Sequence, residues 1–273
     1  MEWRKELGSR SGQGGWKDDF PLSHDLPEAV VVDCGKLDLP IHPMFAVRLR
    51  VFVDWHRPQG RTVELIPPQG SAARRLFEAM RIGDEGGAEE DDAVLPVTKL
   101  TEFLDVEEVA KRTQQILEYD LPDVSLLGEA TFEAVSELCG NAVEHGQNPL
   151  GAYVAVRRVT DPRRQISIAI SDLGMGIPEH VRQRYPEWDD DGFAIAQATT
   201  EGVSGTGHPN RGIGFSSTFE AALTTSLHAA QMDIRSANGL CRIQAVQEKP
   251  KVETIPGPRF RRGTWITYDL VSV

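Results

Sequence analysis

Three polar residues, Glu137, Asn141 and His145, stand four positions apart in one segment of the chain. Residues at this spacing share one face of an α-helix. The amide oxygen of Asn141 is suited to complete the octahedral shell of a magnesium ion that also holds phosphate oxygens and water. Glu137, one turn earlier, is suited to take a proton from an attacking hydroxyl or water. The alternative is a solvated helix face, but these residues adjoin the apolar side, where an uncompensated carboxylate is costly.

A second cluster, Asp172, Gly174 and Gly176, follows a run of alternating isoleucines. The alternation predicts a strand, and its period of two places Asp172 on the face that buries the isoleucines. A carboxylate there can accept a hydrogen bond from the exocyclic amine of adenine, and the glycines let the backbone turn and approach the ring. Thr264, in the last expected strand, is placed to lie beside Asp172. A plain strand-end turn is the alternative, because Asp-x-Gly is common there.

A third cluster, Arg211, Gly212 and Gly214, precedes an expected helix over residues 215–230. Glycines before a helix expose backbone amides, and the helix dipole adds about half a positive charge at that end. These features suit a triphosphate, with Arg211 placed to contact a phosphate oxygen. The sequence lacks the Lys-Ser/Thr signature of a P-loop and a Gly-x-Gly-x-x-Gly after a strand, which disfavours P-loop and Rossmann enzymes. Together the three clusters predict a site for ATP and magnesium.

The elements that must position these clusters lie within residues 94–273. Apolar residues at helical spacing predict two successive helices, over residues 106–119 and 124–145, and the second carries the first cluster. Asn238-Gly239 predicts a tight turn between two short strands. The other expected elements are extended segments over residues 94–103, 153–159, 166–172, 232–235, 240–246 and 264–270, with an irregular stretch over residues 177–210.

The first third of the chain divides by composition into three parts. Residues 1–27 are polar and rich in glycine and proline, which predicts a flexible arm. Residues 28–83 alternate strand and helix patterns and predict a small α/β unit. Residues 84–93 are mostly acidic or glycine and predict a self-repelling linker. Within the small unit, strands are expected over residues 29–34 and 61–66, and helices over residues 42–56 and 71–82.

Composition and charge exclude several classes of protein. The chain has 273 residues, 40% hydrophobic and 26% charged, as is ordinary for a globular protein. A formal net charge of -12 argues against direct binding of nucleic acid. No apolar run reaches the roughly 20 residues of a membrane helix, and the N-terminus lacks the apolar region of an export signal. The three cysteines show no disulfide or zinc pattern. We therefore expect a cytoplasmic protein without a membrane partner.

The order Glu-x-x-x-Asn-Ala, Asp-x-Gly-x-Gly, Gly-x-Gly before a helix and Gly-Thr before a last strand resembles the GHKL ATPase superfamily. This superfamily includes gyrase-type topoisomerases, Hsp90 chaperones, sensor histidine kinases and anti-sigma-factor serine kinases. The resemblance implies an α/β two-layer sandwich over residues 94–273, with ATP between helices and sheet. It implies that Glu137 is the catalytic base, Asn141 the magnesium ligand and Asp172 the adenine partner. The candidate nucleotide-binding set is completed by His145, Gly174, Gly176, Arg211, Gly212, Gly214 and Thr264.

Within the superfamily the chain is most similar to the anti-sigma-factor serine kinases. Sensor histidine kinases usually carry a helical hairpin with a phosphoacceptor histidine where this chain has its acidic linker. Residues 28–83 are weakly similar to STAS domains, the fold of anti-sigma-factor antagonists. The resemblance implies a kinase acting on a regulatory partner, such as a sigma factor or an antagonist, and is compatible with a homodimer. Two alternatives stay open: an ATP-dependent conformational switch with slow hydrolysis, and the catalytic half of a histidine kinase acting in trans.

Overall fold

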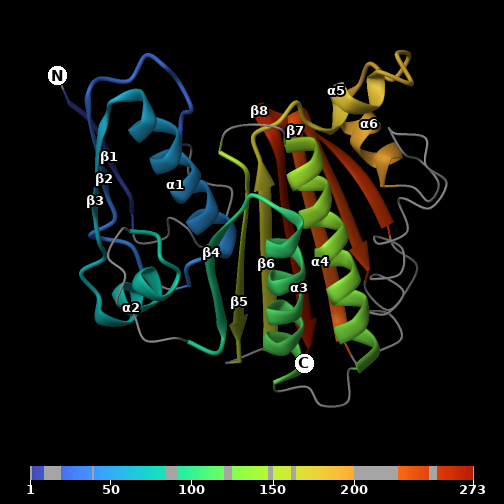
Figure 1. Ribbon diagram of the computed structural model, residues 1–273, viewed down its shortest axis with the longest axis horizontal. Helices are drawn as coiled ribbons and strands as arrows, with labels where there is room; N and C mark the ends of the chain where they lie inside the picture. The colour runs from blue at the N-terminus through green and yellow to red at the C-terminus, as the bar shows by residue number, and fades with distance from the viewer. Residues whose placement is uncertain are drawn as a thin grey trace. The chain divides into compact units, whose positions relative to one another are not determined.

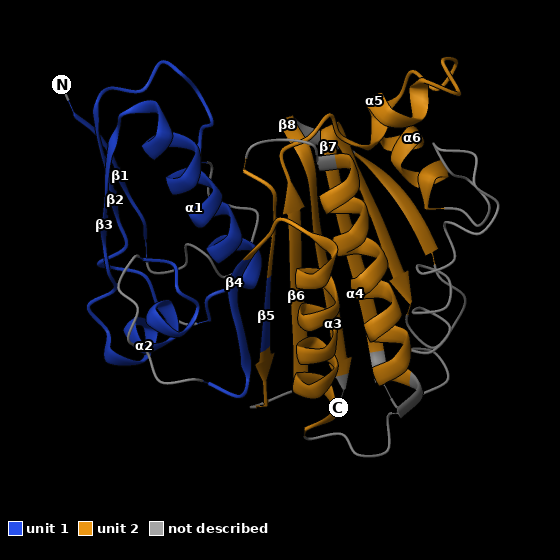
Figure 2. Ribbon diagram, viewed as in Figure 1, with its two compact units in different colours: residues 1–98, 155–157 blue, residues 99–154, 158–273 orange. Residues whose placement is uncertain are grey.

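The computed structural model of the chain describes residues 2–8, 20–38, 40–83, 91–119, 125–146, 150–160, 164–199, 227–245 and 251–272. The chain divides into two compact units (Figure 2). The first comprises residues 1–98 with 155–157, and the second comprises residues 99–154 and 158–273. The domain boundary expected at residue 94 stays a prediction.

The first unit contains a parallel sheet of three strands in the order β1-β2-β3. An α-helix extended by a short 3-10 helix connects β2 to β3, and another α-helix follows β3, so the strand–helix–strand–helix order expected for residues 28–83 is confirmed. β-Branched residues favour β2, and a proline at the first position of α1 is compatible with a helix start. The elements are β1 (Glu2–Glu6), β2 (Ala29–Asp33), α1 (Pro43–His56), the 3-10 helix η1 (Arg57–Gln59), β3 (Thr62–Ile66) and α2 (Ser71–Ala79).

The N-terminal residues belong to this sheet. Strand β1 pairs in parallel with β2, in a register that places Glu2 opposite Ala29. Leu7 is 1% exposed and Phe20 is 5% exposed, and both lie in the apolar core of the unit. The flexible arm expected over residues 1–27 is therefore wrong for residues 2–8 and for Phe20, while residues 9–19 lie outside the described residues. Hydropathy could not reveal β1, because it is a polar strand at the edge of its sheet.

The buried position of Leu7 leads to a first prediction. Leu7→Ala should lower the free energy of unfolding by about 3 kcal/mol, because it leaves a cavity in a packed core. Chemical denaturation followed by circular dichroism measures the change. Leu104→Ala is the control: Leu104 is 74% exposed, and its truncation should cost less than about 0.5 kcal/mol. Equal effects of the two substitutions would contradict the placement of Leu7 in the core.

The second sheet has the strand order β4-β5-β6-β8-β7, in which β6–β8 and β7–β8 are antiparallel. Residues 94–98 of β4 and 155–157 of β5 are counted with the first unit, and the rest of this sheet with the second. Helices α3 and α4 pack against each other and lie over one face of the sheet (Figure 1). This α/β arrangement agrees with the layered fold expected for residues 94–273. The elements are β4 (Val94–Leu100), α3 (Phe103–Glu118), α4 (Ser125–Gly146), β5 (Ala152–Val159), β6 (Arg164–Asp172), α5 (Ile177–Arg182), α6 (Asp191–Ala198), β7 (Leu227–Ala245) and β8 (Lys251–Ser272).

Three expected elements differ from the structure. Residues 177–210 were expected to be irregular, but helices α5 and α6 form within residues 177–198. Asp190 belongs to a polar run, yet it caps α6 by accepting a hydrogen bond of 2.6 Å from the Phe193 backbone. The helix expected over residues 215–230 is wrong at its end, because residues 227–230 begin β7, and residues 200–226 lie outside the described part. The last strand begins at Lys251, well before residue 264.

Strand β7 runs through the turn expected at Asn238-Gly239. The chain nevertheless reverses direction there. The reversal is shown by Arg242, which donates hydrogen bonds of 2.7 and 2.8 Å to the carboxylate of Asp233. Residues nine positions apart in an extended strand would be separated by about 30 Å, so the two halves of β7 must lie side by side. Ala237, with a φ of +50°, lies at the reversal. The expected hairpin is therefore present within a single hydrogen-bonded element.

Two further findings bear on the composition. Cys34, Cys139 and Cys241 are all buried free thiols, and burial raises the pKa of Cys241 to about 11. Among the described residues, no helix has the length and hydropathy needed to cross a bilayer. Of the acidic linker expected over residues 84–93, residues 84–90 lie outside the described part of the chain.

Candidate functional site

Asp172 is a buried carboxylate at the end of β6. It is 6% exposed, and its Oδ1 accepts a hydrogen bond of 2.7 Å from the backbone N–H of Gly174. Burial raises the pKa of Asp172 to about 6, although hydrogen bonds from Gly174 and Thr264 act in the opposite direction. Among the described residues, no cationic side chain contributes to this shift. Within the part of the chain that the structure describes, the carboxylate is therefore buried without the charged partner that usually accompanies one.

Thr264 lies beside Asp172. In the antiparallel pairing of β6 with β8, Ser171 is opposite Trp265, so the next residues along both strands are Asp172 and Thr264. Thr264 forms hydrogen bonds to the Asp172 carboxylate from its side chain and its backbone. This is the neighbour relation expected from the sequence, while the role of Thr264 in binding stays a prediction.

Two glycines with positive φ allow close backbone packing at the end of β6. Gly263 has a φ of +73°, and a Cβ there would overlap the carbonyl oxygen of Asp172 and lie 2.6 Å from Leu173 Cα. Gly176 has a φ of +84° and ends the turn that follows Asp172, where a Cβ would lie 2.5 Å from Ser236 Oγ. L side chains rarely adopt such backbone conformations. Both positions therefore require glycine, and the β8 backbone at Gly263 packs directly against the backbone of Asp172 and Leu173.

Glu137, Asn141 and His145 lie on α4, and each is partly buried. The ring of His145 meets that of His180 in α5, with ring centroids 4.5 Å apart. Helix α5 begins directly after Gly176, so the C-terminal turn of α4 and the turn after β6 lie at the same end of the sheet (Figure 1). Asn141 lies one turn before His145 and Glu137 two turns before it. The structure thus places His145 against the helix that follows the second cluster, with Asn141 and Glu137 progressively farther along α4.

The third cluster, Arg211, Gly212 and Gly214, lies outside the described residues. Its expected contacts with phosphate oxygens stay predictions.

The donor groups suit a magnesium ion that arrives with a nucleotide. Within the described ranges, no group of three or more His, Cys, Asp or Glu side chains is arranged to hold a metal ion. Magnesium carried by ATP needs few protein ligands, because phosphate oxygens and waters supply most of its octahedral shell. The side-chain oxygen of Asn141 is chemically suited to one remaining position.

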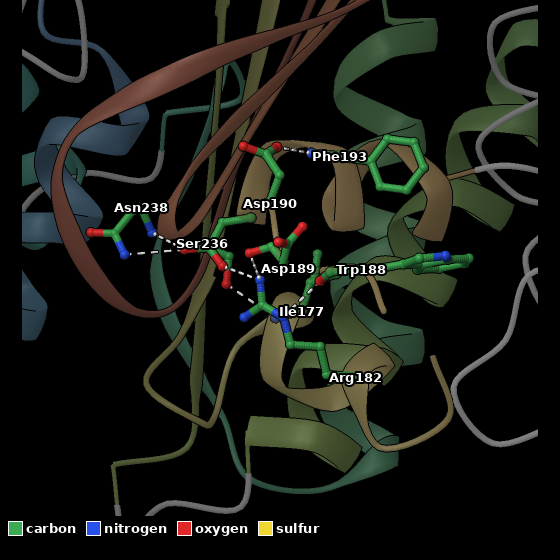
Figure 3. Close-up of polar contacts among 9 residues, drawn as sticks. Ile177, Arg182, Trp188, Asp189, Asp190, Phe193, Ser236 and Asn238 are labelled. Atoms are coloured by element: carbon green, nitrogen blue, oxygen red, sulfur yellow. Dashed lines mark hydrogen bonds and ion pairs between the residues drawn. The ribbon is translucent and has the colours of Figure 1, made fainter. Parts of the chain in front are cut away.

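Helices α5 and α6 are anchored to the tip of the β7 reversal (Figure 3). Arg182 donates hydrogen bonds of 2.7 Å to the backbone oxygens of Trp188 and Asp189, and one of 2.6 Å to Asp191 Oδ1. Asp191 Oδ2 accepts hydrogen bonds from the backbone and side chain of Asn238, at 2.9 and 3.1 Å. The segment that follows the turn after β6 is therefore tied back to the sheet.

Sequence reasoning missed three residues at this end of the sheet: His180, Ser236 and Gly263. Gly263 had a signal, since it directly precedes Thr264 and begins the Gly-Thr pair. His180 and Ser236 had none. Their positions depend on where α5 packs and on the register of β7 with β8, which no local pattern encodes.

No protein-family model and no curated protein sequence matches the chain. One similar solved structure is the 43K ATPase domain of Thermus thermophilus gyrase B in complex with an aminocoumarin, at 17% identity and a TM-score of 0.29, covering 61% of this chain and 40% of that one. Another is the B-subunit of the DNA gyrase from Myxococcus xanthus, at 14% identity and a TM-score of 0.28, covering 60% and 43%. The chain thus spans less than half the length of these structures. Matches at this level assign neither a family nor an activity to the chain.

Proposed function

We propose that the second unit binds ATP together with magnesium, as GHKL ATPases do. The observation that carries the proposal is the burial of the Asp172 carboxylate together with its raised pKa. Among the described residues, no cationic side chain lowers that pKa. Such a buried carboxylate costs stability, and carboxylates with perturbed pKa values are concentrated at functional sites. The exocyclic amine of adenine is a donor that matches the remaining acceptor capacity of this carboxylate.

The proposed roles follow the chemistry of each group. Asp172 accepts from the adenine amine, and Thr264 holds the carboxylate in orientation through the hydrogen bonds that it forms to it. Asn141 contributes an oxygen to magnesium, and Glu137 takes the proton of the attacking hydroxyl or water. Gly174 and Gly176 shape the turn beside the base, the groups proposed to contact the phosphates are Arg211, Gly212 and Gly214, and His145 completes the nucleotide-binding set.

Calorimetric titration with ATP, with and without magnesium, is the direct test of this proposal. We expect saturable binding that tightens when magnesium is present. The absence of ATP binding under both conditions would overturn the proposal, whatever the activity of the protein toward a partner.

The finer proposal is a protein kinase of the anti-sigma-factor type, which transfers the terminal phosphoryl group to a hydroxyl of a regulatory partner. Acid-stable phosphoserine or phosphothreonine on the partner would support it. Acid-labile phosphohistidine would instead indicate the catalytic half of a histidine kinase acting in trans. A partner affinity that depends on ATP without any transfer would indicate a conformational switch. The first unit, weakly STAS-like in its sequence pattern, is proposed to dock the partner or a second copy of the chain.

Glu137→Gln separates chemistry from binding. We expect ATP hydrolysis or phosphoryl transfer to fall by roughly 100-fold, since the amide cannot act as a general base, while ATP affinity stays close to that of the wild type. Phosphate release and calorimetry measure the two properties. Glu133→Gln is the matched control, because it makes the same change one turn earlier on α4, at an exposed position. Equal activity of Glu137→Gln and the wild type would remove Glu137 from the proposed catalytic role.

A further inference from the structure

Ser236 is a fully buried residue of β7 whose hydroxyl joins two turns. It is 0% exposed and stands opposite Thr264 in the pairing of β7 with β8. Its Oγ donates a hydrogen bond of 2.7 Å to the carbonyl oxygen of Gly263. The same oxygen accepts a hydrogen bond of 3.0 Å from the backbone N–H of Ile177, as Figure 3 shows. One hydroxyl therefore satisfies a buried acceptor and a buried donor from two different segments.

Both of these backbone groups belong to the immediate surroundings of Asp172. Gly263 precedes Thr264, which forms hydrogen bonds to the carboxylate. Ile177 follows Gly176, at the end of the turn that Asp172 begins. The turn after β6 and the start of the Gly263–Thr264 segment of β8 are thus connected twice. One connection is made directly at the Asp172 carboxylate, and the other runs through Ser236.

The surrounding backbone leaves little freedom at this connection. Gly176 approaches so closely that a Cβ there would lie 2.5 Å from Ser236 Oγ, and Gly263 packs directly against the backbone of Asp172. The regular pairing of β7 with β8 breaks immediately after Ser236, where the register shifts before Ala237. The hydroxyl therefore links β7 to the two turns at the position where the pairing of β7 with β8 shifts its register.

We propose that Ser236 is a positioning residue that fixes the orientation of Asp172 and thereby sets the preference of the site for a 6-amino purine. This inference rests on the proposed function, in which Asp172 accepts a hydrogen bond from the adenine amine. Without the hydroxyl, the Ile177 N–H and the Gly263 carbonyl lose their partner, and leaving buried polar groups unsatisfied is unfavourable. The two turns then separate or rotate, and the carboxylate loses its alignment with the amine.

A nucleotide pair that differs at this amine isolates the effect. ATP carries the amine, whereas inosine triphosphate carries a carbonyl oxygen at the same position and has the same phosphates. The wild type should bind ATP at least about tenfold more tightly than inosine triphosphate, since a polar group facing the wrong partner is penalised. In Ser236→Ala, ATP affinity should fall about tenfold while inosine triphosphate affinity changes less than about twofold, so that the preference disappears.

Ser167→Ala is the matched control. Ser167 is also buried in the same sheet, and its hydroxyl donates a hydrogen bond of 2.5 Å to Asp269, away from the two turns. It should lower thermal stability and leave the preference for ATP unchanged. Ser236→Thr, which keeps the hydroxyl on a strand that accepts β-branched residues, should retain the wild-type preference.

The outcomes distinguish a failure of the inference about Ser236 from a failure of the proposed ATP binding. A wild type that binds neither nucleotide overturns the proposed function and the inference with it. A wild type that binds both equally overturns the proposed contact of Asp172 with the adenine amine and the inference with it, while ATP binding itself stands. A selective wild type whose preference survives in Ser236→Ala overturns the inference alone. Equal weakening of both nucleotides in Ser236→Ala would also overturn it, because a residue that only supports the fold changes the fraction of active protein and not the ratio of affinities. Loss of the preference for ATP in folded Ser236→Thr protein would also overturn the inference that the hydroxyl sets this preference.

Discussion

Asp172→Asn should make the ligand-free protein more stable at pH 8 and at the same time weaken ATP binding by about 1,000-fold. Substitutions that impair a binding site usually leave stability unchanged or lower it, so opposite changes in the two properties would be diagnostic. They would show that the carboxylate is retained for the ligand and not for the fold.

The gain in stability follows from proton linkage. The pKa of Asp172 is raised from an ordinary value of 3.8 to about 6 by burial, so the folded state binds this proton more tightly than the unfolded state. The resulting stabilisation is fully present below about pH 4 and is lost as the pH rises through 6. A difference of about two pKa units is worth about 3 kcal/mol. An asparagine carries no such titration, so the variant should exceed the wild type by up to this amount at pH 8 and by little at pH 4.

The loss of ATP affinity has two parts. A hydrogen bond to a charged acceptor contributes about 1.5 to 3 kcal/mol, and this contribution disappears when the carboxylate becomes a neutral amide. The new amide N–H also faces the donor amine of adenine, which leaves a buried donor unsatisfied at a further cost of about 1 to 3 kcal/mol. Calorimetry at pH 8 measures the combined effect.

Asp233→Asn is the control for the stability measurement. Asp233 is 2% exposed like Asp172, but Arg242 donates two hydrogen bonds to it. Removing that carboxylate leaves a cation without its partner and should destabilise the protein by about 3 kcal/mol at pH 8. Thermal melts of the wild type and both variants at pH 4 and pH 8 make the comparison. A loss of stability in Asp172→Asn at pH 8, as in Asp233→Asn, would contradict the prediction.

Gly263→Ala should destabilise the second unit by at least about 4 kcal/mol, enough to prevent folding in a marginally stable protein. A Cβ at this position overlaps the carbonyl oxygen of Asp172 and lies 2.6 Å from Leu173 Cα, and the φ of +73° disfavours any L side chain. Backbone atoms cannot move aside as a flexible side chain can, so strands β6 and β8 would have to separate locally.

Gly60→Ala is the control for the backbone conformation alone. Gly60 has a φ of +82°, but no atom lies within 4 Å of the Cβ position. The substitution should therefore cost only about 1 kcal/mol. Denaturation in urea and the yield of folded protein measure both variants. A cost for Gly263→Ala as small as that for Gly60→Ala would show that the close approach of the β8 backbone to Asp172 is absent in solution.

The sequence predicted those parts of the site that depend on local periodicity. The apolar stripe of α4 located the helix that carries Glu137, Asn141 and His145, and the isoleucines of β6 predicted that Asp172 would be buried. The pairing of Asp172 with Thr264 followed from the alternation of the last strand. These features share one cause, since burial on one face imposes a period on the sequence.

The errors arose where burial does not impose a period. Strand β1 is a polar edge strand, so its pairing leaves no hydropathy pattern. Helices α5 and α6 are short, and Asp190, which looked like a loop residue, acts as a helix cap. Ser236 acquires its contacts from the register of β7 against β8 and from the position of α5. Tertiary structure sets these three features, and the local sequence does not encode them.

The anchoring of α5 and α6 to the tip of β7 has a consequence for how this end of the protein opens. Arg182 and Asn238 both bind Asp191, so either helix can move away from the hairpin tip only after these hydrogen bonds break. Helices α5 and α6 and the hairpin tip should therefore unfold locally as one cooperative unit, with similar protection of their amides against solvent exchange.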